Sequence, residues 1–130
     1  MSIKSIIAVE TLDGWVDLNG DQAVEPWPWE QPLHVLSAWS RFRSENENLK
    51  WYSALMDDLW AQGLEIHKAF TRTEGVDPGD WIAVAGLSRP EVIKIARRYG
   101  QEVFFEVNKD EVMVVGVNGT DDAWVVVDPR

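Results

Sequence analysis

The chain has 130 residues, a formal net charge of −10 and no cysteine, and these numbers exclude several classes of protein. A chain of this length is expected to fold as one domain around one core, here residues 1–130. Without cysteine, neither a disulfide framework nor a thiolate zinc site is available. With 12 basic against 22 acidic residues, direct binding to nucleic acid is disfavoured, because it needs cations that displace phosphate counterions.

The apolar run near the N-terminus, residues 3–9, is too short for a signal peptide. No stretch approaches the ~20 apolar residues of a membrane span. We therefore expect a cytoplasmic protein without a membrane partner. Charge is unevenly distributed, since residues 1–33 and 101–130 are acidic, whereas residues 88–100 carry four basic residues against Glu91 and have a net charge of +3.

The N-terminal part predicts a hairpin followed by a connector. Residues 3–10 and 15–18 are expected to pair as two strands across a turn near Asp13 and Gly14, so residues 1–18 are assigned to a hairpin. Residues 19–32 lack periodicity and contain three prolines, which favours an extended connector.

A strand, a helix and a second strand are predicted next. Residues 33–40 are mostly apolar, as in a strand covered on both faces. Ser44 and Glu47 form a capping-box pattern that opens a helix reaching Gln62. Residues 64–72 alternate less cleanly and are more polar, which predicts an edge strand.

The second half repeats this plan. Residues 81–87 contain no polar side chain, so a buried strand is expected. Ser88 and Glu91 form a second capping box, and the helix it opens runs to Tyr99 before Gly100. Three further strands are predicted at residues 102–107, 111–117 and 123–127.

The order of these elements predicts an α+β fold. Residues 33–107 follow the β-α-β-β-α-β order of the ferredoxin-like arrangement, with the strands at 33–40 and 81–87 adjacent in the middle. Residues 108–130 are expected to extend the sheet with two extra antiparallel strands. The protein is predicted to be a monomer, or a homodimer that pairs through the strand at 64–72 or at 123–127 as a sheet edge.

Seven of the eight tryptophans fall into three groups, which are Trp39, Trp81 and Trp124 in predicted strands, Trp51 and Trp60 on the first helix, and Trp27 and Trp29 in the connector. The strand tryptophans are expected in the core. The helix tryptophans lie at the margins of the apolar stripe and should be partly exposed. Because aromatic side chains are favoured at protein interfaces, Trp27, Trp29 and Trp60 are candidates for partner contacts.

Short motifs resemble a bacterial family named domain of unknown function 3293. They are the segments His34 to Trp39, Ser44 to Asn46 with Asn48, and Arg97 to Gln101, and the resemblance covers about residues 33–117. In that family the first strand ends in a Thr-Ala-Trp-Asn-Pro type sequence, and Ser40 and Arg41 replace the Asn-Pro pair here. Gly79-Asp80-Trp81 replaces a more acidic stretch before the third strand. The resemblance implies domain limits and no established activity.

Both predicted helices begin directly after adjacent strands, and this placement suggests a site. We expect the two helix N-termini to lie side by side at one edge of the sheet, where their amides and partial positive charge favour an anion. Arginines lie in the same loops, a tryptophan would form a wall, and an asparagine would orient the ligand. The predicted binding residues are Trp39, Arg41, Arg43, Ser44, Asn46, Arg89 and Gln101. The leading hypothesis is a binding module for a protein partner or a small anionic ligand.

Three other interpretations remain open. In the simplest, the capping boxes only satisfy the helix ends, and Glu45, Glu47 and Glu91 neutralise the arginines. In the second, the same loop edge catalyses a reaction of unassigned chemistry, with Glu45 or His34 as proton carrier. In the third, acidic turns at residues 110–111 and 121–122 help the protein to imitate nucleic acid and inhibit a nucleic-acid-binding partner.

No cofactor and no metal site are predicted. The two histidines, His34 and His67, fall on different predicted strands without the spacing of metal ligands. The sequence also contains no Gly-x-Ser-x-Gly elbow, no P-loop and no Gly-x-Gly-x-x-Gly motif.

Overall fold

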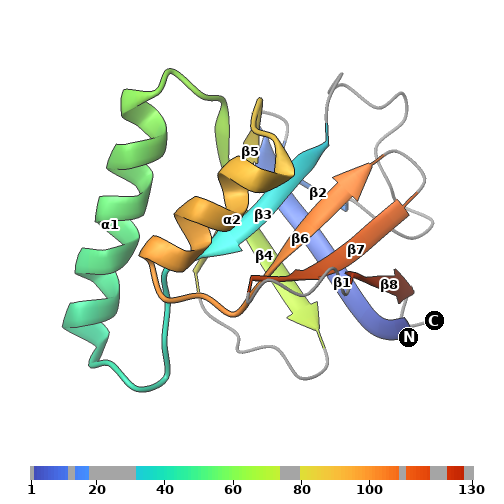
Figure 1. Cartoon of the computed structure of the whole chain (residues 1–130), viewed down its shortest axis with the longest axis horizontal. Helices are drawn as coiled ribbons and strands as arrows, with labels where there is room; N and C mark the ends of the chain where they lie inside the picture. Colours follow the sequence, from blue (N-terminus) through green and yellow to red (C-terminus); the bar gives the residue numbers. More distant parts are fainter. Residues whose placement is uncertain are drawn as a thin grey trace.

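The computed structural model of the chain describes residues 2–11, 14–17, 32–73, 80–108, 111–117 and 123–127. Within these ranges, the side chains at 2–6, 16–17, 72–73, 111 and 123–127, Trp124 among them, are not described. The class is α+β, as predicted, and the described helices cover one face of a curved sheet (Figure 1). Neither of these helices is long and apolar enough to cross a membrane. The predicted connector lies outside the described residues up to position 31.

The predicted N-terminal hairpin is present. Strand β1 (Ser2–Thr11) pairs antiparallel with β2 (Gly14–Asp17). The Thr11 hydroxyl donates a hydrogen bond of 2.9 Å to the carbonyl oxygen of Gly14. Gly14 has a φ of +108°, a left-handed value that glycine adopts without strain, so this residue fits the turn.

Four strands form the middle of the sheet, β3 (Leu33–Ser37), β4 (Ile66–Thr73), β5 (Trp81–Ala85) and β6 (Val103–Asn108). They lie in the order β4-β5-β3-β6 and every neighbouring pair is antiparallel. Strand β3 is shorter than predicted because the Ser37 hydroxyl accepts a hydrogen bond from the Trp39 amide at 3.0 Å and donates one to the Asp80 carbonyl at 2.6 Å. These bonds turn the chain after Ser37, and Trp39 is half-buried instead of belonging to the core.

Both helices begin where their capping boxes predict. Helix α1 (Glu45–Ala61) follows Ser44, whose hydroxyl accepts the Glu47 amide at 3.2 Å, and α2 (Arg89–Arg98) follows Ser88 in the same manner. Each capping glutamate also accepts a hydrogen bond from the serine amide. After α2, Gly100 has a φ of +69°, which confirms its predicted left-handed conformation.

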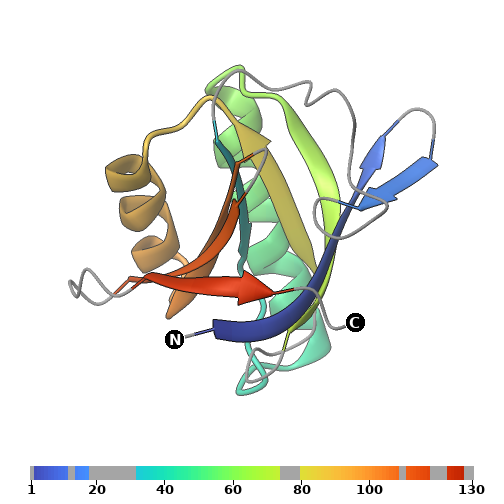
Figure 2. The ribbon, with the colours of Figure 1, turned by 90° about the vertical axis from the view of Figure 1, so that its right-hand side faces the viewer.

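The sheet closes on itself, and this was not predicted. Strands β7 (Glu111–Gly116) and β8 (Ala123–Val127) continue from β6, and β8 then pairs in parallel with residues 2–4 of β1 (Figure 2). Residues 5–9 of β1 pair antiparallel with β4. The predicted sheet edges at β4 and β8 are therefore wrong, because β1 lies beside both strands and occupies their outer sides.

Alternating side chains of the strands build two apolar clusters. On the face that carries the helices, Leu36, Val84 and Phe104 of the strands belong to one buried cluster with Leu55 and Leu59 of α1 and with Val92 and Ile95 of α2. On the inner face of the curved sheet the cluster includes Ile7, Val9, Leu33, Val35, Trp81, Phe105 and Val107. Trp81 is 3% exposed, which confirms its predicted place in the core.

Candidate functional site

The predicted pair of helix N-termini does not exist. In the antiparallel pair of β3 and β5, Ser37 lies opposite Trp81 and Leu33 lies opposite Ala85. The C-terminal end of β3 therefore lies beside the N-terminal end of β5. The chain leaves these two strands at opposite ends of the strand axis. Because each helix begins just after its strand, Ser44 and Ser88 lie at opposite ends of the molecule (Figure 1). The prediction that the two helix N-termini lie side by side was wrong, since it did not account for the opposite directions of β3 and β5.

The predicted site residues divide accordingly. Arg89 lies at the start of α2, whereas Trp39, Arg41, Arg43, Ser44, Asn46 and Gln101 lie at the end where β3 leads into α1. There the Gln101 side-chain amide donates hydrogen bonds of 3.2 Å to the carbonyls of Trp39 and Tyr99. Asn46 is exposed, and Asn48, which was not predicted, orders the loop. Its side chain accepts from the Ser40 amide at 2.8 Å and donates to the Ser40 carbonyl at 2.9 Å.

Arg43 is a structural residue. Its guanidinium donates hydrogen bonds to the Ala38 carbonyl at 2.5 Å and to the Tyr99 carbonyl at 3.3 Å, and lies 4.1 Å from the centre of the Trp51 ring. A cation beside the last carbonyls of a helix is favourable because the helix dipole is negative there. Arg43 thus connects the loop after β3 to the C-terminus of α2.

These contacts predict a difference between two neighbouring arginines. Arg43→Ala is expected to lower the free energy of unfolding by about 1–3 kcal/mol, because it removes two charge-assisted hydrogen bonds and a cation–π contact. Arg41→Ala is the matched control, since this side chain is exposed and lies over the exposed ring of Phe42, and its effect should stay within about 0.5 kcal/mol. Urea denaturation measures both, and equal effects of the two substitutions would contradict the structural role of Arg43.

A buried polar cluster lies under the start of α2. Glu106 accepts hydrogen bonds from the Arg89 guanidinium, at 3.0 Å from Nε and 2.6 Å from Nη2. The Nε2 atom of His34, directly opposite on β3, lies 3.0 Å from the Glu106 Oε2 atom. Glu106 therefore neutralises Arg89, whereas the simplest interpretation of the sequence had Glu45, Glu47 and Glu91 neutralise the arginines. The Nδ1 atom of His34 has no hydrogen-bond partner among the residues that the structure describes.

Burial and hydrogen bonding set the protonation of this cluster. Burial lowers the pKa of His34 below its usual value of 6.5, although Glu106 partly opposes the shift. Hydrogen bonds from Arg89 lower the pKa of Glu106. At neutral pH the cluster thus consists of a neutral imidazole, a carboxylate and a guanidinium, in which His34 donates its Nε2 proton to Glu106. His34 is only 1% exposed, which disfavours its use as a proton carrier for an external substrate.

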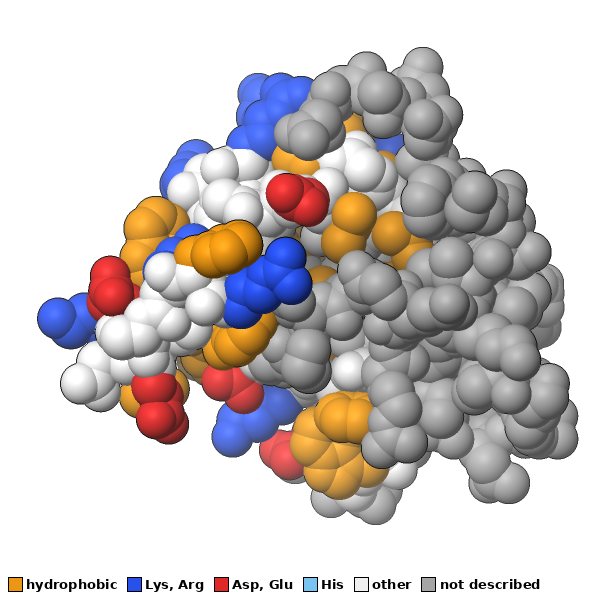
Figure 3. All heavy atoms as spheres, turned by 90° about the horizontal axis from the view of Figure 1, so that it is seen from below, with side chains coloured by type: hydrophobic (Ala, Val, Ile, Leu, Met, Phe, Trp, Pro, Cys, Tyr) orange, Lys and Arg blue, Asp and Glu red, His pale blue; other side chains and the backbone are white. Residues whose placement is uncertain are grey.

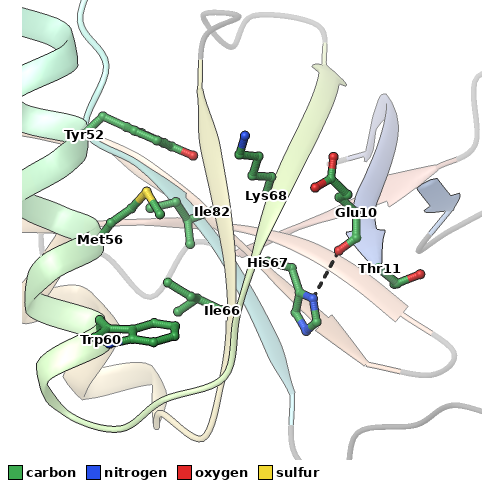
Figure 4. A pocket seen from close by; sticks show the side chains of 9 residues that line it. All are labelled: Glu10, Thr11, Tyr52, Met56, Trp60, Ile66, His67, Lys68 and Ile82. Carbon is green, nitrogen blue, oxygen red and sulfur yellow. Dashed lines mark hydrogen bonds between the residues drawn. The ribbon is translucent and has the colours of Figure 1, made fainter. Parts of the chain in front are cut away.

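A groove of about 440 Å³ lies between α1 and β4 (Figure 4). It exists because the sheet divides here: β1 pairs with β4 only as far as Val9 and Ala69, after which residues 10 and 11 pair with β2 alone. Its lining residues are Glu10, Thr11, Tyr52, Met56, Trp60, Ile66, His67, Lys68 and Ile82. The size falls within the usual range of small-molecule sites.

The groove combines an apolar floor with an exposed aromatic wall. Tyr52, Met56 and Trp60 follow each other at intervals of four residues and line one side from α1. Ile66 of β4 and Ile82 of β5 lie across from them (Figure 4). Trp60 is 72% exposed, so the largest apolar side chain of the groove faces water. Partial exposure of Trp51 and Trp60 was predicted, but the groove was not.

Polar groups lie at two places in the groove. On the β1 side, the Nδ1 atom of His67 lies 3.1 Å from the carbonyl oxygen of Glu10, as the dashed line in Figure 4 marks. On the α1 side, the Tyr52 hydroxyl and the Lys68 ammonium point toward each other. Burial, together with the negative charge of Asp80, raises the pKa of Tyr52, so its hydroxyl is protonated and can donate a hydrogen bond at neutral pH.

Neither a metal site nor the acidic turns can be located among the described side chains. No group of three or more histidine, aspartate or glutamate side chains that could bind a metal ion occurs in the described part of the chain. The acidic turns at residues 110–111 and 121–122, which the mimicry hypothesis involves, have no described side chains.

No family model matches the chain, and neither the curated proteins nor the solved structures contain a match.

Proposed function

We propose that the protein is a small binding module and that its ligand site is the groove between α1 and β4. The observation that supports this most strongly is Trp60, a side chain 72% exposed beside an apolar floor of Met56, Ile66 and Ile82. Apolar surface gains roughly 25 cal/mol for each Å² removed from water, so a ligand that covers this indole and floor is stabilised by their burial. The volume suits a molecule of metabolite size.

A protein partner is the second candidate, favoured by exposed apolar side chains at the start of α1. Phe42 is 86% exposed, Leu49 51% and Trp51 38%. Figure 3 shows this end of the molecule, where hydrophobic and basic side chains lie side by side on the described part of the surface. Aromatic and arginine side chains are those enriched at interfaces. We rank this surface below the groove, because the groove offers a ligand both an apolar floor and an aromatic wall.

Catalysis receives less support. The proton carriers considered from the sequence, His34 and Glu45, do not line the groove. The histidine that does, His67, has its Nδ1 atom 3.1 Å from the Glu10 carbonyl and its Nε2 atom 3.3 Å from Glu65. We therefore favour binding without chemistry.

We further propose that β3 to β6, with α1 and α2, form a ferredoxin-like core. The order β4-β5-β3-β6, its antiparallel pairings and the placement of both helices on one face support this. Membership in the domain of unknown function 3293 family is likewise a hypothesis, and it rests on the short motifs around Trp39, Asn46 and Gln101.

The binding site is tested with a neutral probe and one substitution. ω-Phenylhexanamide should cause saturable chemical-shift changes in the amides of Met56, Trp60 and Ile66, and Trp60→Ala should weaken its binding at least about fivefold, because the aromatic wall is lost. Since Trp60 is largely exposed, the variant should keep its melting temperature. Phe42→Ala is the control, as it removes another exposed aromatic ring outside the groove.

Two results would contradict the proposal. If the probe leaves the groove amides unshifted, or if Phe42→Ala weakens binding as much as Trp60→Ala does, then the groove is not the ligand site. The second of these outcomes would favour the surface at the start of α1.

A further inference from the structure

The groove is polar at one end and apolar at the other. Tyr52 and Trp60 are eight residues apart on α1, which corresponds to about 12 Å along the helix axis. Lys68 reaches toward the Tyr52 end, whereas Ile66, two residues earlier on the same face of β4, lies nearer to Trp60 (Figure 4). A ligand that occupies the full groove therefore has one polar end and one apolar end.

The polar end presents two hydrogen-bond donors. Among the described residues, neither the Tyr52 hydroxyl nor the Lys68 ammonium has a hydrogen-bond or ion-pair partner within the protein. The Lys68 side chain is exposed and its stem lines the groove, so the ammonium group can follow a ligand without losing apolar contacts. Two donors that point toward one place, one of them cationic, match a group with two acceptor oxygens.

Two acidic groups lie near these donors and limit the affinity. Glu10 lines the groove from the β1 side, and the charge of Asp80 acts on Tyr52. Both carboxylates repel an anion, so the binding of an acid should be moderate and should respond to their removal. Asp80 is suited to such a test because Ser37 contacts its backbone carbonyl, and a change of the exposed side chain leaves that hydrogen bond intact.

We propose that the groove selects an elongated carboxylic acid, with the carboxylate between Lys68 and Tyr52 and an aryl or alkyl end against Trp60. This inference rests on the groove being the ligand site. It specifies the chemical class of the ligand, an acid about 10–12 Å long with one charged end. The apolar wall and floor alone do not define this class.

Three probes with the same body separate this inference from the site itself. Dissociation constants of ω-phenylhexanoate, ω-phenylhexanamide and ω-phenylhexylamine are measured by NMR titration at low salt. The acid should bind about five- to tenfold more tightly than the amide, and the amine most weakly, because only the acid pairs with the ammonium group. Binding of the amide alone supports the site. An acid that binds no better than the amide, or an amine that binds best, overturns the proposed selectivity.

Two substitutions locate the carboxylate. Lys68→Met keeps the apolar stem and should bring acid and amide to within about twofold of each other, because the acid loses an ion pair whereas the amide loses only a hydrogen bond to a neutral acceptor. Asp80→Asn should tighten acid binding about two- to threefold at low salt, with no effect on the amide, because a like charge is removed. If the preference for the acid survives in Lys68→Met, or if Asp80→Asn gives no gain, the carboxylate does not lie at this end.

Discussion

Glu106→Ala is expected to lower the free energy of unfolding by about 2–4 kcal/mol, one of the largest effects for a single polar side chain here. The Glu106 carboxylate accepts two hydrogen bonds from Arg89 and faces the imidazole of His34. The Arg89 side chain is 40% exposed and can turn to water, but His34 is 1% exposed and cannot. Most of the loss therefore comes from an imidazole N–H left buried without an acceptor.

Urea denaturation of two further variants tests this explanation. Glu106→Gln keeps the shape and one acceptor oxygen, so its loss should be smaller than that of Glu106→Ala. Glu102→Ala removes an exposed carboxylate shortly before β6 and should change the stability by less than about 0.5 kcal/mol. Equal losses for Glu102→Ala and Glu106→Ala would show that the buried cluster contributes no more to the free energy of unfolding than an exposed carboxylate does.

Acid should destabilise the protein in two successive steps. Since the pKa of His34 is lowered in the folded chain, the unfolded chain binds a proton below pH 6.5 while the folded chain resists it. The contribution of His34 to the free energy of unfolding is thus fully present above that pH, and it is lost as the pH decreases toward the folded-state pKa. The pKa of Glu106 is also lowered from 4.5, so its contribution is present above that value and is lost as the pH falls through its folded-state pKa.

The two steps can be assigned by substitution. His34→Gln retains a side-chain amide that can donate to Glu106 but has no proton to take up near neutrality. In this variant the decrease between pH 6.5 and 4.5 should flatten, whereas the decrease at lower pH should remain. Unfolding free energies from urea titrations at closely spaced pH values provide the measurement. A slope unchanged by His34→Gln would assign the first step to another group.

Features determined by nearby residues were predicted well from the sequence. The capping boxes at Ser44 and Ser88 need only a serine and a glutamate three residues later, and both helices begin there. Apolar runs between turn residues likewise located the strands to within a few positions. Strand β3 was overextended because the hydrogen bonds of the Ser37 hydroxyl, which turn the chain, have no signature in an apolar run.

Features that depend on long-range pairing were not predicted. The pair of His34 and Glu106 joins residues 72 positions apart and requires the register of β3 against β6. The predicted anion site failed for a related reason, since strand direction decides at which end each helix starts. The groove had a weak local signal, the spacing of Tyr52, Met56 and Trp60, but its existence depends on where β1 leaves β4.

The parallel pairing of residues 2–4 with residues 125–127 has a consequence for the folding kinetics. Bringing such distant segments together restricts a long loop, and the entropy lost grows with the length of that loop. This contact is expected to form after the more local hairpins, in the last stage of folding, and topologies rich in such contacts fold slowly. A contact that is absent from the transition state slows unfolding without accelerating folding. The pairing of β1 with β8 is therefore expected to lower the unfolding rate and to leave the folding rate unchanged.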